Sequence, residues 1–443
     1  MARFSFGRVL GLACLVVYAW ALHEVYLEVI SPKFAYNGQV YQEPNLVYYA
    51  ISVLLLSLAW LTGPYRLRSG SDFVLWVFFY LVVASVALVP HFAQGVDAST
   101  ALLLSSVACV SYVVICRVAA TWSPDLFPNW TGLSPRVFVW LLMAASLLSL
   151  VYLGLSGNLS FSVASLFETR ETRFEYRDVV SEGSGLLGYL VRFQGYVLGP
   201  ALLAFAFQRN NWVGVALAVI GQVAIYSLTA YKIVFLSVPV IIILLVLFRR
   251  GRGVSFAVVG FAMTVILVVG TSVDRILDQP IVSEIFINRL LVIPGFLTGV
   301  HVWLFTDAPK YLWSDSVLSS FVSAPYPTSS AFLVGHALTG GMETTANANI
   351  YASGFANAGW VGIVVELLVF ALLLFAVKAC TQRVDRAAVY STLLLPAVAL
   401  ANSGIFAAFL TNGFAYALIL LLLAPRSRSD PQNEQGGPRV STS

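Results

Sequence analysis

Trp212-Val-Gly-Val-Ala-Leu-Ala-Val-Ile-Gly-Gln-Val-Ala-Ile-Tyr-Ser-Leu-Thr-Ala-Tyr-Lys232 continues to Leu247 as a run of 36 residues in which Lys232 is the only charged side chain. An α-helix rises about 1.5 Å per residue, so a single helix of this length would be far longer than the roughly 30 Å core of a bilayer. The run therefore predicts two membrane crossings. We expect the chain to turn near Thr229-Ala-Tyr-Lys232, its most polar part.

The composition of the whole chain agrees with this reading. Hydrophobic residues make up 59% of the sequence and charged residues only 10%, whereas soluble proteins carry roughly 25% charged residues. Apolar runs long enough to span a bilayer recur, so we predict an all-α polytopic membrane protein with about 12 transmembrane helices. The predicted spans are Val9–Val29, Leu46–Thr62, Phe73–Pro90, Thr100–Ile115, Val137–Leu155, Gly185–Phe207, the two halves of Trp212–Leu247, Val254–Thr271, Trp360–Val377, and the two halves of Leu393–Ala424, divided near Asn402-Ser-Gly404. Residues 1–424 form a single transmembrane domain in this prediction, and residues 425–443 a disordered cytoplasmic tail.

The distribution of positive charge predicts the orientation. An even number of spans puts both termini on one side, and with the N-terminus in the cytoplasm only nine of the 25 Lys and Arg residues fall outside. Membrane proteins retain most of their basic residues on the cytoplasmic side, so this orientation is favoured. The nine outside residues are Lys33, Arg170, Arg173, Arg177, Arg192, Lys232, Arg275, Arg289 and Lys310. Two polar inserts, 156–184 and 272–359, then also lie outside.

The larger insert, Ser272 to Gly359, clusters Asp, Arg, His, Asn, Gly and Pro and is predicted to be too polar for lipid. Long irregular segments of this kind are usually functional. Its aromatic, Leu and Val content favours a packed cap over the alternative, a disordered loop.

The smaller insert contains Glu168-Thr-Arg-Glu-Thr-Arg-Phe-Glu-Tyr-Arg-Asp178. Arg170, Arg173 and Arg177 recur at helical spacing and share one face, with carboxylates on the opposite face. Such a helix is either a surface helix stabilised by ion pairs along its length or a binding site for an anion. Arginine suits the second role because its planar guanidinium binds two phosphate oxygens at once. Arg192, inside a span, favours the anion-binding site because charge within a span is costly. Lys232 either adds a further cation or extends its amine to the membrane surface.

Each of the other candidate residues has two possible roles. Arg289, in Asn288-Arg-Leu-Leu-Val-Ile-Pro294, binds an anion or pairs with Glu284 or Asp278. His336 serves as a base or is a satisfied core residue. Tyr311, Trp313 and Tyr326 stack on sugar rings or pack within the cap. Glu366, a carboxylate within a span, is expected to pair with an Arg or with a polar helix neighbour.

Several motifs are absent from the sequence. It has no Walker loop, no Gly-x-Gly-x-x-Gly, no Asp-x-Asp pair and no His, Cys and Asp cluster at metal spacing, so we expect neither cofactor nor metal, and no nucleic acid. An enzyme outside the cytoplasm must then receive its energy in the substrate. A lipid-linked diphosphate is such an activated donor, and arginines would stabilise the charge that develops on it.

The sequence resembles the O-antigen polymerase superfamily, the Wzy-type oligosaccharide repeat-unit polymerases of bacterial envelopes. The resemblance lies in a dozen spans with one large outside loop late in the chain, in the arginine-bearing segment with Asn288-Arg-Leu-Leu-Val-Ile-Pro-Gly295, and in Asn347-Ala-Asn349 through Gly354-Phe-Ala-Asn-Ala-Gly-Trp-Val-Gly362. The sequence departs from the family at Ala352-Ser353, where many members carry an Asp.

The resemblance implies a membrane-embedded, GT-C-like glycosyltransferase in the bacterial inner membrane, with its active site facing the periplasm or exterior. It would join polyprenyl-diphosphate-linked repeat units, as in lipopolysaccharide O-antigen built on undecaprenyl diphosphate, with a chain-length regulator protein and membrane lipids as partners. Glu168, Glu171 or His336 would take the acceptor proton beside Arg289. The donor and the sugars would be bound by Arg170, Arg173, Arg177, Arg192, Lys232, Asn347, Asn349, Tyr311 and Trp313.

A glycan ligase using the same donor and a transporter of lipid-linked glycan stay open as alternatives. The sugars, the linkage, the stereochemical outcome and the oligomeric state are not predicted.

Overall fold

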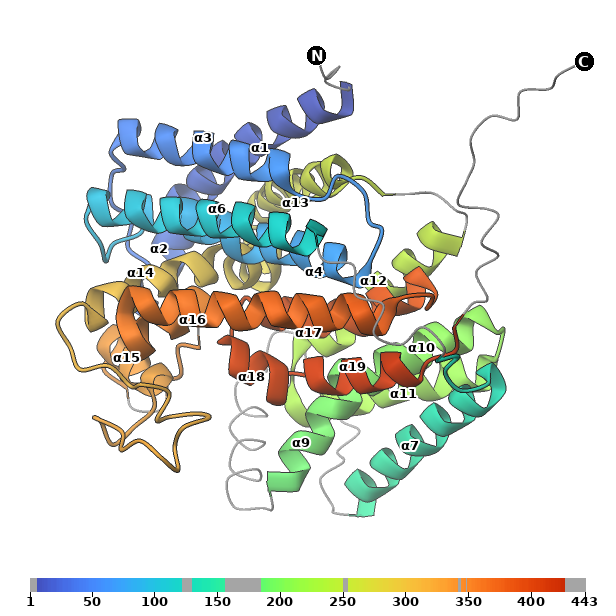
Figure 1. The fold of residues 1–443 in the computed structure, drawn as a ribbon. Coiled ribbons are helices and arrows are strands. Elements are labelled where there is room, and N and C mark those ends of the chain that lie inside the picture. The colour runs from blue at the N-terminus through green and yellow to red at the C-terminus, as the bar shows by residue number, and fades with distance from the viewer. Residues whose placement is uncertain are drawn as a thin grey trace, which may run out of the picture.

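The computed structural model describes residues 6–121, 130–155, 185–249, 254–341, 344–347 and 349–426 (Figure 1). Within these ranges the fold is all-helical and contains no strand. Two isolated backbone bridges, Tyr41 with Ala93 and Arg66 with Ser255, tie connecting segments together at opposite ends of the helical bundle.

The longer helices are α1 (Phe6–Val25), α3 (Leu46–Thr62), α4 (Gly70–Phe78), α6 (Ala98–Thr121), α7 (Pro135–Leu155), α9 (Gly185–Phe193), α10 (Gly199–Gln208), α11 (Trp212–Thr229), α12 (Lys232–Arg249), α13 (Phe256–Leu277), α14 (Ile293–Phe305), α15 (Ser330–Thr339), α16 (Ile350–Thr381), α17 (Arg386–Ala399) and α19 (Phe414–Leu423). Shorter α-helices are α2 (Ser31–Phe34), α5 (Ala84–Leu88) and α18 (Ile405–Leu410). Turns of π-helix form η1 (Tyr26–Ile30), η3 (Phe79–Val83), η5 (Gln194–Leu198) and η6 (Ser283–Val292), and 3₁₀ turns form η2 (Ala35–Asn37) and η4 (Val89–His91).

The bundle has two distinct ends. At one end, on the left of Figure 1, lies α15. Gly38 approaches Leu338 of this helix and Phe296 of α14. We call this the insert end, because the segment from Phe305 to α16 lies there. At the opposite end, Trp130 donates its indole N–H to the carbonyl of Leu422. We call this the tail end, because the segment that follows α19 begins there.

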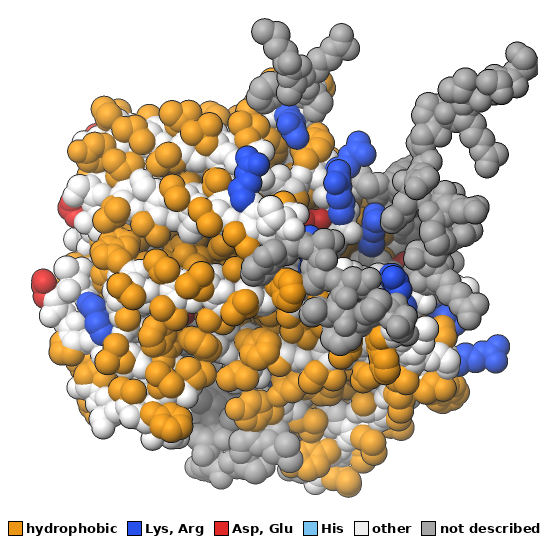
Figure 2. All heavy atoms as spheres, in the orientation of Figure 1, with side chains coloured by type: hydrophobic (Ala, Val, Ile, Leu, Met, Phe, Trp, Pro, Cys, Tyr) orange, Lys and Arg blue, Asp and Glu red, His pale blue; other side chains and the backbone are white. Residues whose placement is uncertain are grey.

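Nine of the described helices are long and apolar enough to cross a membrane, and five more apolar helices are shorter, so the chain is built as a polytopic membrane protein. Large hydrophobic side chains lie on the flank of the bundle, among them Leu148 and Val361, which are 69% and 68% exposed. Figure 2 shows this apolar flank, with most of the visible Lys and Arg side chains near the tail end. An apolar flank between polar ends is the surface that a lipid bilayer requires.

The central helix is the continuous run α4–η3–α5–η4. In its most apolar window, 94% of the residues are buried. It begins with a capping box, in which the Ser69 hydroxyl accepts from the backbone N–H of Asp72 while the Asp72 carboxylate accepts from that of Ser69. One hydrophobic core runs from Leu15 to Ala424 around this helix.

The two breaks expected within long apolar runs are confirmed. Helix α11 ends at Thr229, Ala230 adopts a left-handed conformation with φ 52°, and α12 begins at Lys232. Helix α17 ends at Ala399, and α18 begins six residues later. A further break was not expected: Gly413, at φ 108°, separates α18 from α19.

The prediction that all of Ser272–Gly359 is too polar for lipid is wrong. Helix α13 continues to Leu277, and Ser283–Phe305 is a second helix apolar enough to span a membrane. The Asp274 carboxylate accepts from the backbone N–H groups of Val282 and Ser283, which anchors the start of this second helix to α13. The polar residues of η6 are interspersed among Ile, Leu and Val, so the segment is less polar than its charged residues suggest.

Helix α16 is not straight. Ala358 (φ −152°, ψ 29°) and Gly359 (φ 61°, ψ −143°) leave the helical region, which divides α16 into segments 350–357 and 360–381. The second segment begins at Trp360, where the sequence predicted a span to begin. A β-carbon added at Gly354 would meet the backbone of Ile363 at 2.7 Å, so the two segments pack against each other at their glycines.

Candidate functional site

The bend in α16 brings Ser353 and Glu366 together. Along a straight helix, residues 13 positions apart would be separated by about 20 Å. Here the Ser353 hydroxyl donates to Glu366 Oε1 at 2.5 Å. Segment 350–357 therefore folds back over the start of segment 360–381, and this contact lies at the insert end of the bundle.

Glu366 is fully buried and joins three parts of the chain. Besides Ser353, its carboxylate accepts from the backbone N–H of Ile405 at 3.0 Å and from the indole Nε1–H of Trp313 at 3.4 Å. A carboxylate is an acceptor only, and each of these three groups is a donor. The expectation that Glu366 pairs with an Arg or with a polar helix neighbour is confirmed in its second form: among the described residues the partners are Ser353, Trp313 and the backbone of Ile405.

The insert is fixed to this junction through its backbone. Tyr311 N–H donates to the carbonyl of Ala356, and Leu312 N–H to that of Asn357. Trp313 N–H donates to Asn357 Oδ1 at 2.6 Å. Leu312 and Trp313 both have positive φ, 50° and 58°, so the chain turns sharply at the point where the indole meets Glu366. Trp313 remains half-buried, beside the ring of Phe406.

Tyr311 cannot stack on a sugar in this structure. It is fully buried, its ring packs against those of Phe305 and Tyr326, and its hydroxyl donates to the carbonyl of Thr328. Burial also raises the pKa of its phenol, as does the nearby charge of Asp315. Of the two readings for Tyr311, packing within the cap is therefore the one that the structure supports.

The two candidate asparagines have different positions. Asn349 is fully buried and caps α16: its Oδ1 accepts from the backbone N–H groups of Tyr351 and Ala352, and its Nδ2 donates to Pro294 O and Thr298 Oγ1. These bonds occupy the whole amide, so Asn349 is a structural residue here, not a sugar ligand. Asn347 is exposed.

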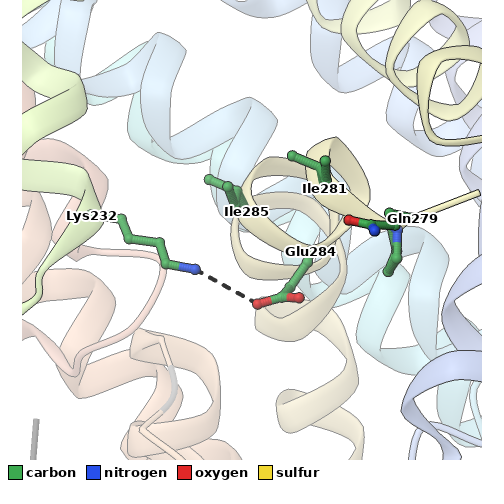
Figure 3. A pocket seen from close by; sticks show the side chains of 6 residues that line it. Lys232, Gln279, Ile281, Glu284 and Ile285 are labelled. Carbon is green, nitrogen blue, oxygen red and sulfur yellow. Dashed lines mark ion pairs between the residues drawn. The ribbon is translucent and has the colours of Figure 1, made fainter. Parts of the chain in front are cut away.

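Lys232 and Glu284 form an ion pair across two separate elements at the insert end. Their charged atoms lie 3.7 Å apart, and Lys232 is only 15% exposed while Glu284 is 53% exposed. Figure 3 shows Lys232 extending from the start of α12 toward Glu284 on η6. The pair borders a hollow of about 180 Å³, whose other lining residues are Gln279, Pro280, Ile281 and Ile285.

A closed series of contacts connects the helices that carry these residues. Asn349 links α16 to α14, and Glu366 links α16 to α18. Phe193 of α9 meets Tyr416 of α19 with ring centroids 5.1 Å apart. The series continues through one hydrophobic cluster that joins α9 to α12 by Val191 and Val234, and it closes through the pair of Lys232 and Glu284. The two described clusters of polar residues thus belong to the same set of packed helices.

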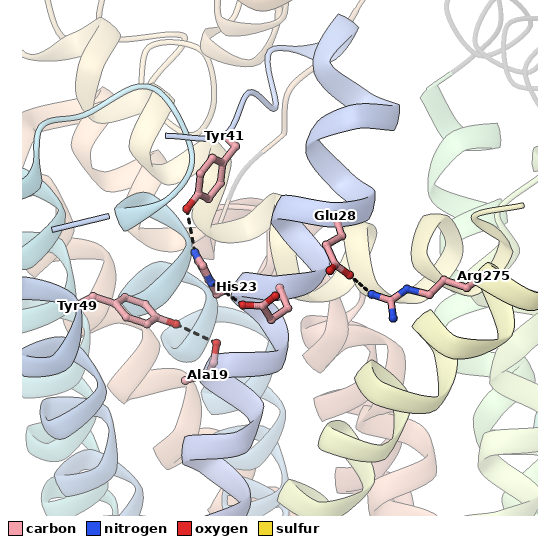
Figure 4. Close-up of polar contacts among 7 residues, drawn as sticks. Ala19, His23, Glu28, Tyr41, Tyr49 and Arg275 are labelled. Atoms are coloured by element: carbon pink, nitrogen blue, oxygen red, sulfur yellow. Dashed lines mark hydrogen bonds and ion pairs between the residues drawn. The ribbon is translucent and has the colours of Figure 1, made fainter. Parts of the chain in front are cut away.

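Two other cations at the insert end have structural contacts. Arg275 pairs with Glu28, which ties α13 to η1, and nearby the hydroxyl of Tyr41 lies 3.2 Å from His23 Nε2 (Figure 4). Lys310 lies over the ring of Phe355 and donates to the carbonyls of Thr306 and Ala308. Burial lowers the pKa of Lys310, although the charge of Asp307 opposes this effect.

The remaining candidates are placed as follows. Arg192 is half-buried in the last turn of α9, directly before the π-helical turn η5. Arg289 is exposed on η6, and Glu284, one of its expected partners, is paired with Lys232 instead. His336 is exposed on α15. Glu168, Arg170, Glu171, Arg173 and Arg177 lie outside the described residues.

Comparison with protein-family models, curated proteins and solved structures finds no match to this chain. Within the described ranges, no group of three His, Cys, Asp or Glu residues is placed to hold a metal ion. The site is therefore characterised by its own residues: cations on η6, α9 and α12, and a buried carboxylate under a half-exposed serine. Sequence reasoning assigned no role to Ser353. The signal that would have identified it is Glu366, since a carboxylate in a span requires donors nearby.

Proposed function

We propose that this protein polymerises polyprenyl-diphosphate-linked oligosaccharide repeat units at the insert end of its helical bundle. In this reaction the glycan on one lipid diphosphate is transferred to a hydroxyl of the non-reducing sugar on a second lipid-linked unit. The lipid diphosphate leaves, and neither a nucleotide nor a metal is required. The protein would be a GT-C-like glycosyltransferase, held in the bacterial inner membrane with its insert end outside the cytoplasm.

The observation that carries the proposal is the position of three cations at the insert end, Arg192, Lys232 and Arg289. Of the nine basic residues expected outside the cytoplasm, six are described: Lys33, Arg192, Lys232, Arg275, Arg289 and Lys310. Arg192 and Lys232 lie on neighbouring helices that share one hydrophobic cluster, and Arg289 is one π-helical turn beyond the partner of Lys232. Cations beside an apolar flank suit a ligand that combines a diphosphate with a lipid chain.

The smaller insert supports the same proposal from the sequence. Leu153, near the end of α7, packs in one cluster with Leu228 and Val234, and α9 begins at Gly185. The helices on either side of residues 156–184, α7 and α9, therefore share one hydrophobic cluster with α12. Arg170, Arg173 and Arg177 would add charge to the same donor site.

The test is reconstitution of the purified full-length protein in lipid vesicles. Lipid-linked oligosaccharides, extracted from source cells that lack this protein, are supplied as the sole substrate. The proposal predicts a ladder of products that differ by one repeat unit, with release of polyprenyl diphosphate. A ligase would give no ladder until a second kind of acceptor is added. A transporter would move the lipid-linked glycan across the vesicle without forming a new glycosidic bond. Either of these two outcomes would refute the proposal.

A further inference from the structure

We propose that Ser353 and Glu366 form the proton-accepting pair for the acceptor sugar, with Trp313 as the adjacent sugar-binding wall. The inference rests on the polymerase function proposed above and assigns it the acceptor side of its site. Ser353 would be the catalytic residue that touches the acceptor hydroxyl. Glu366, which has no exposed surface, would act through Ser353 as its positioning residue.

The arrangement of donors around Glu366 supports this assignment. Of the three groups that donate to its carboxylate, the Ile405 N–H is buried, while Ser353 and Trp313 are half-buried and reach the surface. The Ser353 Oγ therefore directs its proton inward to the carboxylate at 2.5 Å. It also accepts a long hydrogen bond from Asn357 Nδ2 at 3.5 Å, so one of its two lone pairs is left to accept from a further donor. An oxygen held in this way is oriented to accept a proton from an incoming hydroxyl.

Glycine at position 404 leaves room for the pair. A β-carbon there would lie 2.2 Å from Ser353 Oγ and 3.2 Å from Glu366 Oε2. The turn between α17 and α18 can therefore approach both side chains only if residue 404 has no side chain. The same turn places Phe406 against the edge of the Trp313 ring, with centroids 6.2 Å apart, so that an aromatic surface borders the hydroxyl. Half-exposed aromatic rings of this kind present both an apolar face and a polar edge.

The step balances without a further reactant. The acceptor oxygen forms a bond to the anomeric carbon of the donor glycan, and the bond between that carbon and the diphosphate oxygen breaks. The electron pair leaves with the diphosphate, which the cations stabilise. The acceptor hydroxyl passes its proton to Ser353 Oγ, Ser353 passes its own proton to Glu366, and Glu366 later returns a proton to water.

The test compares variants in the ladder assay, with initial rates measured against the concentration of the extracted lipid-linked oligosaccharide. S353A removes the hydroxyl, and S353T retains one. Loss of general-base assistance typically costs a factor of about 100 or more in rate. We expect S353A to lower kcat by about that factor with little change in KM, and S353T to recover at least a tenth of the wild-type kcat. The matched control is S106A, because the Ser106 hydroxyl donates only to a carbonyl of its own helix, Leu102 O, and S106A should keep the wild-type kcat.

Two further variants address the neighbours of Ser353. E366Q should lose as much kcat as S353A, and the double variant should lose no more than either alone, because the two residues act as one unit. W313F keeps a ring and should mainly raise KM. If E366Q fails to fold, S353A and S353T still decide the question, since Ser353 is half-exposed.

The outcomes separate the two proposals. A wild-type ladder together with S353A kinetics within threefold of wild type would overturn the Ser353 assignment and leave the polymerase function intact. A loss of activity in S353A that follows a loss of folded protein, or that S353T does not recover, would also overturn it. If the wild-type protein forms no ladder, the polymerase function fails and the assignment of Ser353 fails with it.

Discussion

Ser353 and Glu366 belong to the same helix, 13 positions apart, and are hydrogen-bonded because α16 reverses direction at Gly359. This contact connects the insert, through Trp313, to the turn before α18, through the backbone of Ile405. The insert end is thus not a set of loops attached to a bundle. It is one packed unit in which a single carboxylate fixes three segments relative to each other.

Replacing Gly359 with Ala tests the importance of the reversal. A β-carbon at this position has only Lys310 within 4 Å, at 3.8 Å, so the cost is one of backbone conformation and not of steric overlap. Because φ 61° with ψ −143° is essentially limited to glycine, we expect G359A to lower the free energy of unfolding by about 1–3 kcal/mol. Thermal unfolding in detergent measures the effect. G299A is the control, since a methyl group there meets its neighbours at 3.8 Å and should cost nothing; equal Tm values for the two variants would contradict the prediction.

Asn347 and Asn349 are two residues apart and should behave in opposite ways. N349A removes the cap of α16 and leaves the carbonyl of Pro294 without its donor, so it should reduce stability by about 1–3 kcal/mol. N347A alters an exposed side chain and should change stability by less than about 0.5 kcal/mol. If N347A lowers activity at unchanged Tm, Asn347 binds substrate. A larger loss of stability in N347A than in N349A would show that the placement of the cap is incorrect.

Arg289 should matter for activity and not for folding. It is exposed, and its former candidate partner Glu284 is paired elsewhere, so R289A should change the Tm very little. Loss of a charged hydrogen bond to diphosphate, worth about 1.5–3 kcal/mol, should weaken donor use by roughly 10- to 100-fold. Product chain length and initial rate are the measurements, with K33A as the control at the same end of the bundle. Product chains of normal length from R289A would show that Arg289 does not bind the donor.

Lys232 and Glu284 should have opposite effects on binding of the lipid diphosphate. If the phosphate displaces Glu284 from Lys232, K232M should weaken equilibrium binding of undecaprenyl diphosphate, whereas E284Q should maintain or tighten it. A purely structural ion pair predicts similar losses for both variants. The controls are R275M and E28Q, which break an ion pair at the same end and should leave binding unchanged. A loss of affinity in E284Q equal to that in K232M would argue against displacement.

The lowered pKa of Asp97 predicts how the stability of the protein changes with pH. Hydrogen bonds from Ser99 and Thr100 hold the pKa of its carboxyl below the ordinary value of 3.8. The ionised carboxylate therefore stabilises the start of α6 at neutral pH, and this contribution disappears as the pH falls from about 4 through the lowered pKa. The difference in Tm between wild type and D97N should narrow over that range. A difference that stays constant from pH 7 to pH 3 would show that the charge of Asp97 contributes nothing.

Most of the apolar helices could be predicted from the sequence, and the contacts of the site could not. Uninterrupted apolar runs, and the lysine at position 232, were sufficient to place the turn between α11 and α12. By contrast, Glu284, Asn288 and Arg289 made η6 look too polar for lipid, although the residues between them are apolar. Gly359 is tolerated in a helical pattern, so periodicity alone does not reveal the reversal of α16 or the contact between Ser353 and Glu366. Only tertiary packing brings positions this far apart in sequence into contact.

The most direct test of the account is a structure of the full-length protein in lipid with undecaprenyl diphosphate bound. The account predicts the diphosphate at the insert end, within hydrogen-bonding distance of at least two of Arg192, Lys232 and Arg289, with the lipid chain lying along the apolar flank. A diphosphate bound at the tail end, for example by Arg66 and Arg68, and in contact with none of Arg192, Lys232 and Arg289, would contradict the account.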